Sequence, residues 1–70
     1  MEQSELELLH TLIESSPFNL GDIVRVVDLE TEGQWVIKEF SLMREQLCVL
    51  LVCDEVTTYA LEKHIRFYHQ

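Results

Sequence analysis

The sequence predicts a mainly β domain with one N-terminal α-helix, in which about five short strands form a small barrel or a strongly bent antiparallel sheet. The first observation is the uncharged apolar run LCVLLVC at residues 47–53, whose length and valine content favour a buried strand. The second is that β-prone runs stand on both sides of it, at residues 34–42 and 56–61. The third is helical spacing of leucines ahead of Pro17. Periodicity alone leaves a buried helical segment open for residues 47–53.

The first expected element is a short amphipathic helix. Ser4 and Glu7 have the spacing of a capping box, which predicts that the helix begins at Ser4. Pro17 disfavours helical geometry in the residue before it, so the helix should end between Glu14 and Ser16. A helix of this length is marginal alone in water, so we expect it to cover one end of the sheet. Its apolar stripe is made of Leu6, Leu8, Leu9, Leu12 and Ile13.

The next two strands are expected on either side of a polar loop. Gly21 suits a turn, and residues 23–27 after it read as a strand by composition. Residues 34–42 form a longer β-prone run whose apolar alternation slips near Lys38 and Glu39. That slip is typical of a β-bulge or of a strongly bent strand.

A hairpin is expected to follow. Residues 47–53 and 56–61 are separated by Asp54 and Glu55, which suit a two-residue connection although neither is glycine. Residues 47–53 would then be an inner strand, flanked in the sheet by residues 34–42 and 56–61.

The C-terminal part allows two interpretations. Residues 62–64 suit a single helical turn, followed by a last short strand at residues 65–68. A helix through residues 61–69 is the alternative, because Leu61, Ile65 and Tyr68 also fit helical spacing.

Three stretches carry a resemblance to a known class of domains. They are LGDIVRV at residues 20–26, GQWVI at residues 33–37 and YALEKHI at residues 59–65. They resemble landmarks of SH3-like, KOW-like and Tudor-like barrels, and the leading helix is similar to the Sm-like variant. The length of the chain predicts one domain, residues 1–70, with the amphipathic helix in residues 1–16. The resemblance implies a five-stranded SH3-like barrel in residues 18–69. Such barrels bind peptides, modified protein tails, RNA or other subunits, so the resemblance implies no single function.

The charge balance restricts the partners. Thirteen acidic residues against five basic ones give a formal charge of −8. Affinity for nucleic acid comes largely from Lys and Arg, so direct nucleic-acid binding and binding to anionic membranes are disfavoured. An acidic surface can instead bind a basic protein surface. A chain of 70 residues is small enough that monomer and homo-oligomer both stay open.

Cys48, Cys53, His64 and His69 roughly have the spacing of a zinc site with two cysteine and two histidine ligands. On a strand, residues five apart point to opposite faces and lie about 16 Å apart, which argues against convergence on a metal and against a Cys48–Cys53 disulfide. No cofactor is expected, and no catalytic motif is present that would indicate an enzyme. Two cysteines and no secretory signal after Met1 predict a reducing, cytoplasmic location.

The leading hypothesis is therefore a non-enzymatic protein–protein interaction module or accessory subunit, which binds a partner through a sheet edge or an aromatic groove. Large aromatic residues and arginine are enriched in binding hot spots, so the expected partner-binding residues are Trp35, Tyr59, Arg66 and Tyr68. One alternative is an acidic inhibitor of phage or mobile-element type that blocks a basic nucleic-acid-binding surface by charge mimicry. A further alternative is an Sm-like ring that binds RNA.

Overall fold

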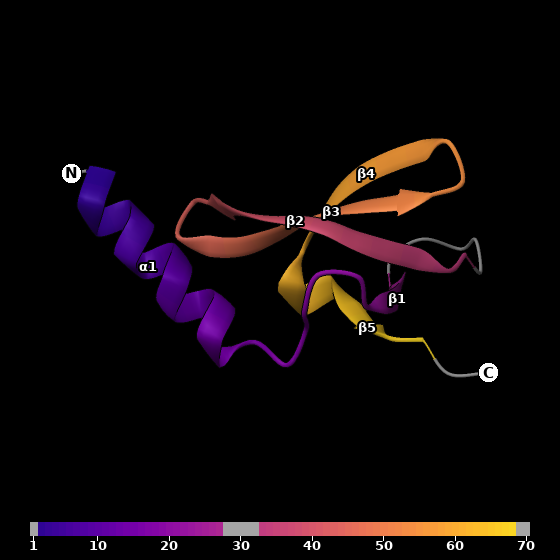
Figure 1. Ribbon diagram of the computed structural model, residues 1–70, viewed down its shortest axis with the longest axis horizontal. Coiled ribbons are helices and arrows are strands. Elements are labelled where there is room, and N and C mark those ends of the chain that lie inside the picture. Colours follow the sequence, from indigo (N-terminus) through magenta and orange to yellow (C-terminus); the bar gives the residue numbers. More distant parts are fainter. Residues whose placement is uncertain (1, 28–32, 69–70) are drawn as a thin grey trace.

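Five strands and one N-terminal helix make up the computed structural model, which describes residues 2–27 and 33–68 (Figure 1). The elements in chain order are α1 (Glu2–Ser15), β1 (Ile23–Val26), β2 (Trp35–Met43), β3 (Gln46–Cys53), β4 (Val56–Leu61), the 3₁₀ turn η1 (Glu62–His64) and β5 (Ile65–Phe67). The strands form one antiparallel sheet in the order β4-β3-β2-β1-β5, and the sheet does not close on itself. The expected fold class, mainly β with an N-terminal helix and a five-stranded antiparallel sheet, is confirmed.

Helix α1 lies beside the sheet, next to the turn that joins β2 and β3 (Figure 1). It ends at Ser15, as the position of Pro17 predicts. The expected start at Ser4 is wrong, because the helix already includes Glu2; once a helix is nucleated, extending it costs little. None of its described side chains is fully buried, and Leu6 is 53% exposed. The helix therefore covers one end of the sheet with a shallow contact.

The hairpin of β2 and β3 contains the predicted irregularity. Its register shifts between Ile37 and Glu39, so Lys38 is the extra residue of a β-bulge. The strands are joined through Arg44 and Glu45, which have φ angles of 49° and 64°. Two positive φ angles are typical of the type I′ turn, whose twist matches that of the strands it connects.

The hairpin of β3 and β4 is closed by Asp54 and Glu55, as expected from the sequence. Cys53 faces Val56 in the register, and Asp54 has a φ of 55°. Aspartate tolerates this left-handed conformation better than most residues, which explains a tight turn without glycine. Strand β3 lies between β2 and β4, as predicted, although β2 is the middle strand of the sheet.

The chain returns to β1 through β5. The helical interpretation of residues 61–69 is wrong, since only η1 is helical and β5 pairs with β1 in the register Val24↔Phe67 and Val26↔Ile65. The pairing extends by one bond at each end, from Val27 N–H to the carbonyl of His64 at 2.8 Å and from Tyr68 N–H to the carbonyl of Ile23 at 3.1 Å. Hydrogen bonding to β1 thus holds the C-terminal segment extended.

The buried core cluster takes side chains from β1, β2, β3 and β5, and the partly buried Ala60 of β4 packs against it. Val49 and Leu51 of β3 are fully buried in it, while Leu50 between them and Val52 after them are only half-buried. The other members are Phe18, Val24, Val26, Trp35, Ile37 and Ile65. Among the described residues, no helix is long and apolar enough to cross a membrane.

Candidate functional site

A groove beside β5 combines aromatic and basic side chains. Its volume is about 410 Å³. It is lined by Pro17, Phe18, Glu62, Lys63, Ile65, Arg66 and Phe67. These residues come from the segment between α1 and β1, from η1 and from β5, so the groove depends on the pairing of β5 with β1.

The floor of the groove is an aromatic pair. Phe18 and Phe67 lie with their ring centroids 4.6 Å apart and their planes inclined by 39°. Phe67 faces Val24 in the β1–β5 register, which puts it on the core side of β5 above Phe18. Phe18 is 6% exposed, whereas Phe67 is 39% exposed. The pair therefore connects the core to the surface, because the Phe18 ring is buried and the Phe67 ring is partly exposed to solvent.

Arg66 is fixed along the rim of this groove. One guanidinium nitrogen, Nη1, donates hydrogen bonds to the carbonyl of Lys63 at 2.9 Å and to the carbonyl of Ile65 at 2.8 Å. An arginine has five N–H donors, so the remaining ones are left for a ligand. The fixed guanidinium loses little conformational entropy when it binds one.

This part of the molecule is also locally basic. Arg25 lies directly opposite Arg66 in the β1–β5 register, and both are exposed. Together with Lys63 they are three of the five basic residues of the chain. In the part of the chain that the structure describes, neither arginine has an ion-paired carboxylate, so the like charges are uncompensated there.

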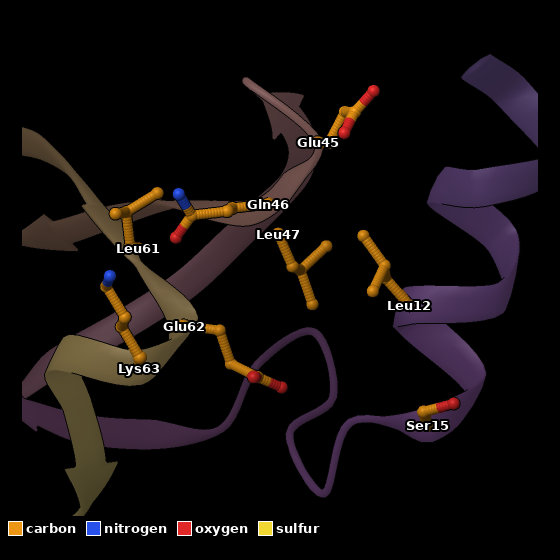
Figure 2. A pocket seen from close by; sticks show the side chains of 8 residues that line it. All are labelled: Leu12, Ser15, Glu45, Gln46, Leu47, Leu61, Glu62 and Lys63. Carbon is orange, nitrogen blue, oxygen red and sulfur yellow. The ribbon is translucent and has the colours of Figure 1, made fainter.

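A second hollow, of about 250 Å³, lies between α1 and the sheet. Figure 2 shows Leu12 of α1 pointing toward Leu47 of β3, with Glu62 and Lys63 across the opening. Glu62 and Lys63 line both hollows, so η1 forms the ridge between them. The space reflects the shallow packing of α1.

The structure does not bring the four expected partner-binding residues together. Trp35 is 6% exposed and belongs to the core, so the expectation that it binds a partner at the surface is wrong. Its indole N–H has no hydrogen-bond partner among the described residues. Tyr59 is 64% exposed on β4, at the other edge of the sheet. Arg66 lines the groove, and the half-buried Tyr68 follows β5 directly.

Of the residues that line the groove, sequence reasoning expected only Arg66 in partner binding, and the most important ones that it missed are Phe18, Lys63 and Phe67. Alternation within β5, where Ile65 and Phe67 share a face opposite to Arg66, was the available signal for Phe67. The approach of Phe18 depends on the path of the chain between α1 and β1, which no local pattern predicts.

The cysteines and histidines occupy separate places. Cys48 is buried and Cys53 is half-buried, and both are free thiols on opposite faces of β3. Within residues 2–27 and 33–68, no three His, Cys, Asp or Glu side chains are grouped as a metal would need. His69, the fourth residue of the spacing, lies outside the described residues.

Comparisons with protein-family models, with curated proteins and with solved structures find no match for this chain. Its function is therefore inferred from its own geometry and charge. Two surfaces stand out on this basis: the aromatic groove beside β5 and the edge of β4.

Proposed function

We propose that this protein is a non-enzymatic protein–protein interaction module, and that it binds an extended segment of a partner protein in the groove beside β5. The observation that carries the proposal is the Phe18–Phe67 pair, whose partly exposed Phe67 ring lines a groove that Lys63 and Arg66 also line. Exposed aromatic rings with adjacent arginine are typical of binding hot spots.

The lining of the groove indicates the chemistry of the partner segment. An apolar side chain fits the ring of Phe67, where its burial is favourable. Lys63 and Arg66 outweigh Glu62 in the lining, so an acidic residue next to that apolar side chain matches the rim. Outside the groove this protein is strongly acidic. The partner's surface on either side of the bound segment should therefore be basic.

We further propose that the fold is a variant of the SH3-like barrel. The strand order β4-β3-β2-β1-β5, the bulge in β2 and the 3₁₀ turn between β4 and β5 support this assignment. Peptide binding in a surface groove is among the functions that such a barrel implies. The assignment supports the binding proposal without replacing the evidence of the groove.

The test is selection from a random peptide library displayed on phage, with the full chain immobilised. Selected peptides should share an apolar residue beside an acidic one, and Lys63→Glu should weaken their binding about tenfold by reversing one rim charge. Phe67→Ser should abolish binding. Tyr59→Ser is the matched control, because Tyr59 is exposed on the other edge and should not matter. Peptides that bind Lys63→Glu and Phe67→Ser as well as the parent would contradict the proposal.

Charge mimicry is the second candidate function, because Glu5, Glu7 and Glu14 are exposed on α1 and none has an ion-paired base among the described residues. An acidic inhibitor of this kind would bind a basic nucleic-acid-binding surface. Its affinity should fall steeply as salt is raised, whereas apolar groove binding should change little. Affinity for the natural partner that is insensitive to salt would remove this candidate.

A further inference from the structure

Strand β5 forms one edge of the sheet, with β1 as its only neighbour in the strand order. In an antiparallel pair, every second residue directs its N–H and C=O groups away from the neighbouring strand. The hydrogen bond from Val27 N–H to the His64 carbonyl fixes this alternation for the segment that follows. The backbone groups of Ile65 and Phe67 therefore point away from β1, toward the free edge beside the groove.

The two free-edge residues differ in what their backbone groups already bind. The N–H of Ile65 donates to the carbonyl of Glu62, and the carbonyl of Ile65 accepts a hydrogen bond of 2.8 Å from Arg66 Nη1. No described residue hydrogen-bonds to the N–H or to the carbonyl of Phe67. Unpaired backbone groups at a sheet edge are a template for another strand. Within β5, Phe67 is therefore the residue at which a partner segment can pair.

Arg66 limits how far such a segment can extend. Its guanidinium is held at the free edge by the carbonyls of Lys63 and Ile65. On a strand, the carbonyl of one residue and the N–H of the residue two further on point to the same side, so this guanidinium lies next to the N–H of Phe67 along the edge. It occupies the place where a segment paired with Phe67 would continue along β5. A paired segment must therefore end opposite Phe67.

Charge decides which end of the partner chain lies there. An antiparallel segment ends at this point with its C-terminal carboxylate, whereas a parallel segment begins there with its N-terminal ammonium group. A guanidinium has donors and no acceptor, so it binds the carboxylate and repels the ammonium group. Among the described residues that line the groove, Glu62 is the only acidic one, and in Figure 2 its carboxylate points toward the hollow between α1 and the sheet. The antiparallel orientation is therefore favoured.

We propose that the groove beside β5 binds the C-terminal residue of a partner protein, an inference that rests on the proposed function of the groove. The N–H of the terminal residue donates to the Phe67 carbonyl, and its carboxylate accepts from the Phe67 N–H and the Arg66 guanidinium. Residues that face each other in an antiparallel pair direct their side chains to the same face of the sheet. The terminal side chain therefore packs beside the Phe67 ring, which selects an apolar residue. One residue then supplies both the apolar group and the negative charge that the groove lining matches.

Affinity capture of a peptide pool on the immobilised full chain tests this proposal. The pool contains acetylated peptides that end in leucine and have random residues other than aspartate and glutamate before it, so the terminal carboxylate is their only one. It is prepared in three forms: with the free carboxylate, with a C-terminal amide, and with a short serine tail after the leucine. Mass spectrometry identifies the captured peptides, and fluorescence anisotropy measures their affinities. The free-carboxylate form should bind about tenfold more tightly than either other form.

A variant at Arg66 separates the carboxylate contact from the rest of the groove. Arg66→Gln should bring the affinities of the free-carboxylate and amide forms close together, with little change in the affinity of the amide form. Arg25→Gln is the matched control, because it removes the same charge from an exposed residue that faces Arg66 but lies on β1, away from the free edge. With this control the difference should stay at about tenfold. An equal loss of the difference in both variants would indicate general electrostatic attraction and would overturn the proposal.

The three peptide forms also distinguish the failure of this proposal from the failure of the proposed function. Suppose that the amide and serine-tailed forms bind as tightly as the free-carboxylate form, and that Phe67→Ser abolishes the binding of all three. The groove then binds a partner segment but not a chain end, and the proposal is overturned while the proposed function stands. Capture of no free-carboxylate peptide overturns the proposal as well, and the phage-displayed library then decides separately on the proposed function.

Discussion

Phe18 and Phe67 pack ring against ring at a centroid distance of 4.6 Å, although one precedes β1 and the other ends β5. This contact joins the segment after α1 to the last strand. It also places the partly exposed ring of Phe67 in a locally basic part of an acidic protein. The groove is therefore a product of the same packing that holds β5 in the sheet.

The two rings should contribute unequally to stability. Phe18→Ala removes a buried ring and should cost about 3–5 kcal/mol, which is most of the free energy of unfolding of so small a domain. Phe67→Ala removes a partly exposed ring and should cost about 1 kcal/mol. Circular dichroism and urea unfolding measure both. An equal cost for the two variants would contradict the packing described.

Replacing Arg25 by glutamate should stabilise the domain. The change converts a like-charged cross-strand pair with Arg66 into an oppositely charged one, worth about 0.2–1 kcal/mol at low salt. Urea unfolding should show this gain and its loss at high salt. Lys38→Glu, with the same charge change at the bulge, should give no gain; a similar gain there would contradict the assignment of the effect to the Arg25–Arg66 pair.

Glycine at position 45 should stabilise the β2–β3 turn. Glu45 has a φ of 64°, a conformation that costs an L-residue roughly 1–2 kcal/mol and glycine much less. Glu45→Gly should therefore raise the free energy of unfolding by up to about 1 kcal/mol. Glu55→Gly is the matched control at a turn residue without positive φ, and it should lower stability. The reverse order in urea unfolding would contradict the turn geometry.

Helix α1 should open before the sheet does. None of its described side chains is fully buried, so little apolar area is lost when it leaves Leu47. Native-state hydrogen exchange should show lower protection in α1 than in β3. Leu12→Ser should lower the protection of α1 further, because Leu12 points toward Leu47 of the sheet. Leu6→Ser should have a smaller effect, because Leu6 is largely exposed already. Equal protection in α1 and β3 would show that the helix is an integral part of the core.

Most of the strand layout followed from local chemistry. The slip of alternation at Lys38 predicted the bulge, and the Asp54-Glu55 pair predicted the second hairpin, because each signal acts within a few residues. The helix start was missed because the capping preference of Ser4 is worth too little to stop a helix that extends to Glu2.

The candidate site was harder to predict. The sequence identified Trp35 as a large aromatic residue on a strand, but only the bend of the sheet decides that it faces the core. Arg66 was expected at the surface and does line the groove. Phe18 and Phe67 come together only through the pairing of β1 with β5. This is a long-range contact, and the periodicity of the sequence does not predict it.

The measurement that tests the central claim most directly is an NMR titration of the isotopically labelled full chain with a peptide selected from the library. We predict chemical-shift changes at Phe18 and at residues 63–67, with the β4 amides unaffected. Changes concentrated in β4 or in α1, with residues 63–67 unaffected, would contradict the claim that the groove beside β5 binds the partner.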